Sequence, residues 1–184
     1  DILSHQLQYE APFDENGLFH YIGTVGGTRP YQNPHTSGDV VAALSNSGGF
    51  LSSHPHKFVG RISDGFNFTS DEGESWMGVD IGPKRRLIPN YYCLRTDQCP
   101  RKMMNWEIQA MVGGDMGEWV TLRRHEDDFT LEDEPHSVGS WSIPVKDDTP
   151  YRYFRIFQFG KNSSNTHHLA CCGMELYGSF VELQ

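Results

Sequence analysis

Histidine pairs are the residues of this 184-residue chain whose type and spacing come nearest to a catalytic or metal-binding arrangement. His54 and His56 flank a proline, His167 and His168 are adjacent, and His125 stands apart. Adjacent side chains on an extended chain point in opposite directions, and His54 with His56 supplies fewer ligands than a zinc site needs. The sequence also lacks a nucleophile elbow, a phosphate-binding glycine loop and a zinc-protease helix motif. We therefore expect no enzymatic activity, no metal and no cofactor in this chain.

Four cysteines and one acidic run are the other groups that could carry chemistry. Cys93, Cys99, Cys171 and Cys172 are too sparse for a disulfide scaffold, and the adjacent pair lacks the spacing of zinc ligands. They indicate reduced thiols and an intracellular, cytoplasmic location, with one member of the adjacent pair buried and the other exposed. The acidic run 126–134 predicts either a solvated loop or an oxygen-ligand cation site.

The net charge of -9 disfavours nucleic acid and anionic lipid as partners, because both require a surplus of Lys and Arg. No apolar run approaches the roughly 20 residues that span a bilayer. Residues 1–9 have neither an initiator Met nor the pattern of a signal peptide, which indicates a segment of a larger protein. Sequons at Asn67 and Asn162 would permit glycosylation only if the chain were secreted.

The elements that must position these residues are predicted to be short strands. Nineteen Gly and ten Pro separate stretches rich in β-branched and aromatic residues, a pattern typical of an all-β sandwich or barrel. Within the long loop 24–75, only 40–44 could form a short helical turn. We expect strands at 19–22, 76–81, 86–94, 105–111, 119–125, 139–143, 151–159 and 171–180.

Three tryptophans lie at expected strand positions beside aliphatic residues. We expect Trp76, Trp106 and Trp119 to belong to the core, where each would contribute roughly 2–3 kcal/mol. Asp80 is expected to cap a turn or to pair with an arginine. Arg152 and Arg155 are expected to be structural strand residues.

Four stretches occur in the order found in a known family. These are Trp-Met-Gly-Val-Asp-Ile-Gly at 76–82, Trp-Glu-Ile-Gln-Ala at 106–110 leading to Trp119, Tyr-Arg-Tyr-Phe-Arg-Ile at 151–156, and Met-Glu-Leu-Tyr-Gly at 174–178. Together they resemble the discoidin (coagulation-factor C-type, galactose-binding-like) domains. The resemblance implies one domain over 1–184, a jelly-roll β-sandwich with its strand core at about 76–180 and long loops at one end.

The variant resembled most is the intracellular one found with BTB and kelch modules or in large ubiquitin-ligase proteins. Secreted members tie their terminal strands together with a disulfide, whereas here no cysteine precedes Cys93. Members that bind membranes insert apolar loop residues, but the early loop 23–35 is polar in this chain. The resemblance therefore implies reduced cysteines and no membrane binding.

In the resembled domains the ligand generally lies where three loops converge, and the matching segments here are 24–35, 95–102 and 160–168. Their basic groups favour an acidic or carboxylate-bearing partner, with Arg95 and Lys161 as electrostatic anchors and Tyr31 as the aromatic one. The expected ligand-binding residues are Arg29, Tyr31, Asn33, His35, Arg95, Arg101, Lys161, Asn162, His167 and His168.

Two functions from different classes follow from this resemblance. The first is a non-catalytic module that binds a protein or peptide, such as a substrate recruited for ubiquitylation. The alternative is a carbohydrate-binding module, in which Tyr31 would stack on a sugar while Arg95, Asn162 and His167 bond its hydroxyls.

Overall fold

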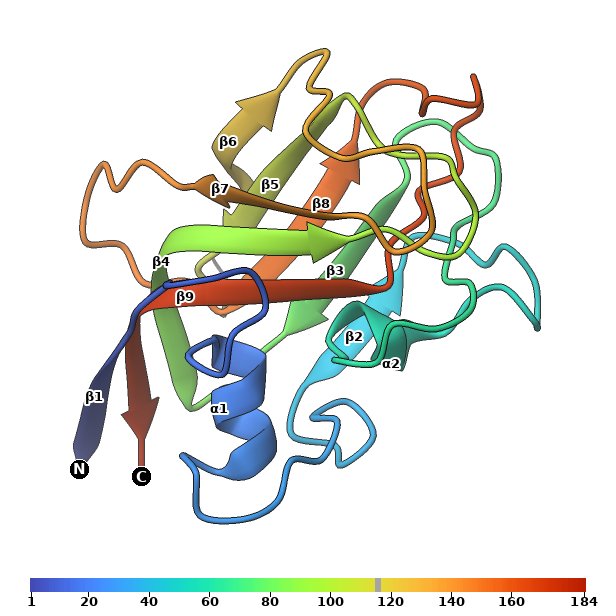
Figure 1. Ribbon diagram of the computed structural model, residues 1–184. Helices are drawn as coiled ribbons and strands as arrows, with labels where there is room; N and C mark the ends of the chain where they lie inside the picture. Colours follow the sequence, from blue (N-terminus) through green and yellow to red (C-terminus); the bar gives the residue numbers. More distant parts are fainter. Residues whose placement is uncertain (115–116) are drawn as a thin grey trace.

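Two antiparallel sheets face each other in a computed structural model that describes residues 1–114 and 117–184 (Figure 1). The four-stranded sheet has the order β1-β9-β4-β7 and the five-stranded sheet the order β2-β3-β8-β5-β6. The first sheet consists of β1 (Ile2–Leu7), β9 (Gly173–Leu183), β4 (Arg85–Arg95) and β7 (Val138–Ser142). The second consists of β2 (Val41–Leu44), β3 (Trp76–Asp80), β8 (Tyr153–Gln158), β5 (Trp106–Met111) and β6 (Val120–His125).

Side chains from alternate strand positions fill the space between the sheets. Met77 and Val79 of β3 point inward and pair across the ladder with Ile156 and Phe154 of β8. Since each fully buried aliphatic or aromatic side chain contributes about 1.5–3 kcal/mol, this layer is the main source of stability. The prediction of an all-β sandwich is confirmed.

Most strands lie where the sequence predicts them. Strands β3 to β9 each overlap one of the seven expected strands from 76 to 180. The N-terminal strand β1 was not expected, and it pairs with the last strand, for example Leu7 with Gly178. Local pattern did not reveal β1 because its residues are mostly exposed and alternate weakly.

The expected strand 19–22 is wrong, because these residues belong to helix α1 (Leu18–Thr24). The carboxylate of Glu175, on the distant strand β9, accepts hydrogen bonds from the backbone N–H groups of Phe19 (2.8 Å) and His20 (3.2 Å). The first N–H groups of a helix have no partner within the helix, so this contact stabilises its start. Burial raises the pKa of Glu175 to about 7.

The segment 24–75 contains more regular structure than expected. Residues 41–44 form strand β2, which pairs with β3 in the register Ala42 to Val79, so the expected helical turn at 40–44 is wrong. The exposed edge of β3 provides hydrogen-bond partners that the local sequence does not show. A short helix, α2 (Pro55–Phe58), follows. No helix within the described residues has the length and apolar character needed to cross a membrane.

The three tryptophans expected in the core have different positions. Trp106 of β5 has no exposed surface. Trp76 of β3 and Trp119 are only partly buried, and their rings lie 5.8 and 4.1 Å from the guanidinium carbon of Arg155. The core expectation is therefore wrong for Trp76 and Trp119. Side chains alternate along β3, so the inward positions on either side of Gly78 place Trp76 on the outer face.

Candidate functional site

Two of the three expected binding loops meet at one end of the sandwich. The backbone N–H of Lys102 donates to the Ser163 hydroxyl (3.0 Å), and the N–H of Ser163 donates to the Lys102 carbonyl (3.0 Å). The segment 45–75 contacts both, since the Gln98 N–H donates to the Gly65 carbonyl (2.9 Å) and His168 Nδ1 lies 2.8 Å from the Thr69 carbonyl. We call 45–75 with 95–102 and 160–168 the loop end.

Phe68 lies at the centre of the loop end. The guanidinium of Arg101 lies over its ring at 3.9 Å, and the His168 ring meets it edge-on at 5.4 Å. Its backbone N–H donates to the Ser52 carbonyl (2.7 Å). A Cβ on Gly48 would lie 2.8 Å from a ring carbon of Phe68, so this close approach requires glycine. All three segments of the loop end are thus packed around one ring.

The first expected loop, 24–35, is connected elsewhere. The Asn33 side-chain amide donates to the His56 carbonyl of α2 (2.9 Å), and His35 Nδ1 accepts from the backbone N–H of Ala42 (3.0 Å). No hydrogen bond among residues 1–114 and 117–184 links this loop to 95–102 or 160–168. Asn33 therefore ties this loop to α2, and His35 ties it to β2.

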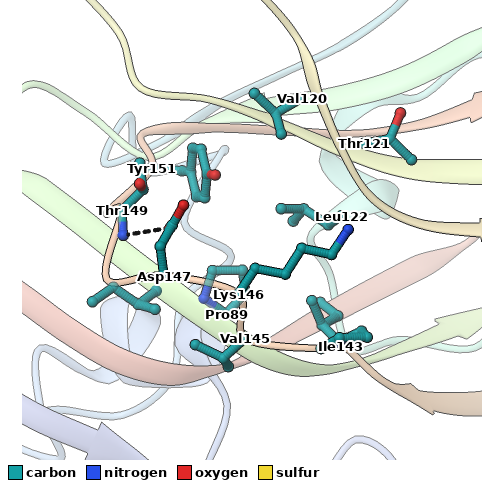
Figure 2. Close-up of a pocket in the computed structure, with 12 residues that line it drawn as sticks. Pro89, Val120, Thr121, Leu122, Ile143, Val145, Lys146, Asp147, Thr149 and Tyr151 are labelled. Carbon is teal, nitrogen blue, oxygen red and sulfur yellow. Dashed lines mark hydrogen bonds between the residues drawn. The ribbon is translucent and has the colours of Figure 1, made fainter.

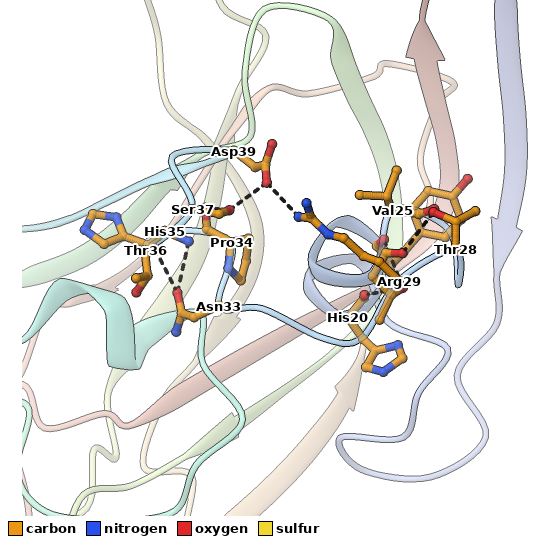
Figure 3. A network of polar contacts seen from close by, with 12 residues as sticks. His20, Val25, Thr28, Arg29, Asn33, Pro34, His35, Thr36, Ser37 and Asp39 are labelled. Atoms are coloured by element: carbon orange, nitrogen blue, oxygen red, sulfur yellow. Dashed lines mark hydrogen bonds and ion pairs between the residues drawn. The ribbon is translucent and has the colours of Figure 1, made fainter.

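Arg29 lies in the polar network that holds this loop together (Figure 3). Its guanidinium pairs with Asp39 at 3.4 Å, and the Ser37 hydroxyl donates to the same carboxylate oxygen at 2.6 Å. The pair is partly exposed, where an ion pair contributes at most about 1 kcal/mol. The charge of Arg29 is thus already partnered within its own segment.

Tyr31 faces a cavity between its loop and α2. Its ring stacks on His20 at 5.8 Å, and its hydroxyl is buried with no hydrogen-bond partner among the described residues. Burial raises the pKa of Tyr31 to about 12, so the hydroxyl stays protonated. The cavity has a volume of about 350 Å³. It is lined by Tyr31, Asn33, His56, Lys57, Gly60, Arg61, Ile62 and Asp64.

Arg95 and Asn162 lie inside the structure. Arg95 is 6% exposed, with its guanidinium 4.0 Å above the Phe13 ring and a hydrogen bond to the Cys172 carbonyl (3.2 Å). Asn162 is 2% exposed, and its amide donates to the His168 carbonyl (2.9 Å). Both side chains therefore shape the loop end from within.

Lys161, Arg101 and His167 remain at or near the surface of the loop end. The Lys161 side chain is exposed, and Arg101 and His167 are partly buried. The backbone N–H of His167 donates to Asp71 (2.6 Å), which joins segment 160–168 to segment 45–75. Their side chains are the basic groups that a ligand at this end would meet.

The two sequon asparagines are both buried. The Asn67 side chain accepts from the His54 backbone (2.7 Å) and donates to the Cys171 carbonyl (2.9 Å). A glycan on this nitrogen could not be housed in the core, because Asn67 has no exposed surface. Asn162 is likewise enclosed.

All four cysteines are free thiols, and both members of the adjacent pair are buried. The expectation that one of Cys171 and Cys172 would be exposed is wrong. Segment 64–65 covers the outward position, with the Cys172 sulfur 3.6 Å from the Asp64 carbonyl. Burial raises the pKa of each thiol to about 12, so neither is reactive at neutral pH.

His125 belongs to a buried polar chain. The Trp106 indole donates to the Tyr92 hydroxyl (3.0 Å), which lies 2.6 Å from His125 Nε2, and His125 Nδ1 lies 2.8 Å from Asp128. Because the Asp128 carboxylate can only accept, the ring proton of neutral His125 lies at Nδ1, and Nε2 accepts from the Tyr92 hydroxyl. Burial lowers the pKa of His125, and the Asp128 carboxylate only partly offsets this. The arrangement is enclosed and structural.

The acidic run 126–134 has partners of its own. Glu126 pairs with Arg124 (2.7 Å), and the Asp133 carboxylate accepts a short hydrogen bond from the Ser163 hydroxyl of the loop end. Within residues 1–114 and 117–184, no three His, Cys, Asp or Glu side chains lie close enough together to hold a metal ion.

A second, smaller cavity opens at the opposite end of the sandwich (Figure 2). Its volume is about 110 Å³, and its lining is mainly apolar, with Val120, Leu122 and Ile143 around it. None of the ten expected ligand-binding residues lines it. It has no connection with the loop end.

Sequence reasoning missed the most exposed apolar residues of the loop end. Phe50 is 93% exposed, Leu51 78% and Ile62 72%, and Phe66 of the same segment is 39% exposed. An apolar pair between Gly-Gly and Ser-Ser in an otherwise polar loop was the available signal. The early loop 23–35 is polar, but the loop end carries an apolar tip.

No family model matches this chain. It is 35% identical over 185 residues to the E3 ubiquitin-protein ligase hecd-1 of Caenorhabditis elegans, covering 98% of this chain and 7% of that protein. It is 34% identical to the E3 ubiquitin-protein ligase Ufd4 of Drosophila melanogaster, over 92% of this chain and 6% of that protein. A BTB/POZ domain-containing protein of Arabidopsis thaliana is 30% identical, over 95% of this chain and 22% of that protein. The chain thus spans less than a quarter of each of these relatives.

Solved structures decide the fold. A chitosan-binding module of a Paenibacillus chitosanase/glucanase matches with a TM-score of 0.55 and 16% identity, over 76% of this chain and 96% of that one. A family 32 carbohydrate-binding module of Clostridium perfringens, in complex with galactose, matches with a TM-score of 0.54 and 12% identity, over 79% of this chain and 96% of that one. This chain has the discoidin-like fold. The motifs between 76 and 178 therefore predicted the fold correctly. The similarity to ubiquitin-ligase and BTB proteins matches the intracellular variant that the sequence resembles.

Proposed function

We propose that this discoidin-like chain is a non-catalytic recognition module that binds a protein or peptide partner through its loop end. The observation that carries the proposal is the exposed tip Phe50-Leu51, held by the packing of segment 45–75 around Phe68 and placed in the same loop end as Arg101 and Lys161. An exposed apolar pair on a packed loop, in the same loop end as basic side chains, is the kind of surface that marks a protein interaction site.

The basic groups favour an acidic partner. The chain carries a net charge of -9, so most of its surface repels acidic proteins while Arg101 and Lys161 attract them locally. We infer that the partner is a substrate recruited for ubiquitylation in an intracellular, cytoplasmic setting. The similarity to two proteins named as E3 ubiquitin-protein ligases supports this role.

Carbohydrate binding is the second candidate. The observation in its favour is the fold, which this chain shares with modules solved in complex with galactose and with mannuronic acid. The buried Tyr31 hydroxyl beside the 350 Å³ cavity could bond a sugar hydroxyl there.

Affinity capture from cytosol with matched variants tests the proposal. We expect Phe50→Ser with Leu51→Ser to abolish capture of the partner, and Lys161→Ala to weaken it. The matched controls Val145→Ser and Lys146→Ala, exposed residues at the opposite end, should leave capture unchanged. Equal capture by test and control variants would remove the loop end as the binding site. Micromolar binding on a glycan array that Tyr31→Phe abolishes would favour the carbohydrate function.

A further inference from the structure

The outer face of the five-stranded sheet carries an unusual set of side chains, distinct from the loop end. Three rows cross the sheet perpendicular to its strands, and the register places Arg155 in the middle row between Gly78 and Gln109. The row on one side contains Trp76 and Phe157, which are directly opposite each other on neighbouring strands. No helix packs closely against β8, β5 or β6 in the part of the chain that the structure describes.

Aromatic rings surround the Arg155 guanidinium. Its carbon lies 4.1 Å from the ring centroid of Trp119, 5.1 Å from that of Phe157 and 5.8 Å from that of Trp76. A Cβ on Gly78 would lie 3.1 Å from the Arg155 Cβ, so glycine leaves room for the side chain. Stacking between rings fixes the plane of the guanidinium and removes water from its faces.

Only one of the three nitrogens of the Arg155 guanidinium donates a hydrogen bond among the described residues. Its Nε donates to the Gln109 side-chain oxygen (2.7 Å), and neither terminal nitrogen has a hydrogen-bond acceptor within residues 1–114 and 117–184. Gln109 is held in turn by Glu107, to which its amide donates (2.8 Å). Arg155 is therefore oriented, and its two terminal NH2 groups have no acceptor among the described residues.

Asp80 of β3 and Glu107 of β5, acidic side chains on this face, are already engaged. Asp80 binds Arg152 through both oxygens (2.7 and 3.0 Å). Glu107 accepts from Arg124 (2.7 Å) in addition to Gln109. Arg155 is thus a partly buried cation with no carboxylate partner among the described residues. A planar guanidinium with free terminal nitrogens matches a carboxylate in shape and charge.

We propose that the outer face of the five-stranded sheet is a second docking surface, on which Arg155 binds a carboxylate of a partner protein between Trp76, Trp119 and Phe157. The aromatic rings cover the apolar part of the partner's acidic residue. Tryptophan, tyrosine and arginine are the residues that carry most binding energy at protein interfaces. The site is independent of the loop end.

Nuclear magnetic resonance titration of the whole chain with a capped glutamate residue, N-acetyl-glutamate N-methylamide, tests the proposal. We expect saturable shifts of the Arg155 Nε–H and of the Trp76 and Trp119 indole N–H signals. The matched amide, N-acetyl-glutamine N-methylamide, should give none. The indole signals of the buried Trp106 and Trp141 serve as internal references and show that each variant is folded.

Arg155→Gln should weaken binding by roughly tenfold or more, because it removes a charge-assisted pair. Arg86→Gln is the matched control, since Arg86 lies on the other sheet and donates only to backbone carbonyls among the described residues. Trp119→Ala is the second variant, to be used if Arg155→Gln does not fold. It should also weaken binding. Lys161→Ala should have no effect, which separates this surface from the loop end.

Three results would overturn the proposal. One is the absence of a saturable shift with capped glutamate, and another is an equal loss of affinity in Arg155→Gln and Arg86→Gln. The third is a concentration-dependent shift of the same signals without ligand, which would assign the face to self-association.

Discussion

The two faces of the five-stranded sheet are both rich in aromatic residues, but they differ in how their polar atoms are satisfied. On the inner face, Trp106 is fully buried and its indole N–H begins a closed chain through Tyr92 and His125 to Asp128. On the outer face, Trp76 and Trp119 surround Arg155, whose terminal nitrogens have no acceptor among the described residues. A complete polar chain indicates a structural role, and an open one indicates a binding role.

The largest effect is expected at the centre of the inner face. Trp106→Ala should destabilise the protein by about 3–5 kcal/mol, because it leaves a large cavity and removes the hydrogen bond to Tyr92. Urea unfolding followed by circular dichroism measures the change. If Trp106→Ala and Trp76→Ala lowered the free energy of unfolding equally, the proposed difference between the two faces would be wrong.

Removing only the polar link should have a smaller effect on the same face. Tyr92→Phe deletes the hydroxyl that accepts from Trp106 and donates to His125, and leaves two buried nitrogens without partners. We expect a loss of about 1–3 kcal/mol. The control Tyr9→Phe changes a tyrosine that stacks on Tyr91 near the N-terminus and should stay near wild type.

The pH dependence of stability should separate two buried groups. The His125 pKa is lowered by burial, so the unfolded chain binds the proton more readily and stability falls as the pH drops below 6.5. Glu175 has the opposite sign, because burial raises its pKa from 4.5 to about 7 and stability falls as the pH rises through that window. Relative to wild type, His125→Gln should lose the first dependence and Glu175→Gln the second. Identical pH profiles for both variants would contradict these assignments.

On the outer face, Trp76→Ala should cost only about 1 kcal/mol, since the ring loses its contacts with Arg155 and Phe157 but creates no enclosed cavity. Thermal and urea unfolding of Trp76→Ala and wild type measure this change in the free energy of unfolding. A loss above that of Tyr92→Phe would assign Trp76 to the core after all.

The smallest effect is expected at the loop end. Lys161→Ala and Phe50→Ser change exposed side chains and should alter stability by no more than about 0.5 kcal/mol. Unfolding curves that overlay on wild type would allow any loss of binding in these variants to be read as a contact effect. A large destabilisation would show that the tip is part of the scaffold.

Local pattern by itself determined most of the sandwich. A period of two in segments such as 76–81 and 151–159, punctuated by Gly and Pro, predicted strands that the structure contains. The sequence also predicted that Asp80 caps a turn or pairs with an arginine, and Asp80 accepts from the Gly82 backbone (2.9 Å) and binds Arg152. The strands and the turn at Asp80 depend on neighbours in sequence and can be read from it, whereas Arg152, the partner of Asp80, lies 72 residues away along the chain.

Only the tertiary structure decided which residues are available to a ligand. Arg95 is enclosed because Phe13, from a segment 82 residues earlier, lies against its guanidinium. Residues 18–24 form a helix because the Glu175 carboxylate reaches its first N–H groups from the last strand. Alternation along each strand puts Trp76 in phase with Gly78 and Asp80 and Trp106 in phase with Ile108 and Ala110, but only the tertiary structure places Arg155 against the Trp76 ring. Contacts between distant segments set burial and polar satisfaction, and short sequence windows do not contain them.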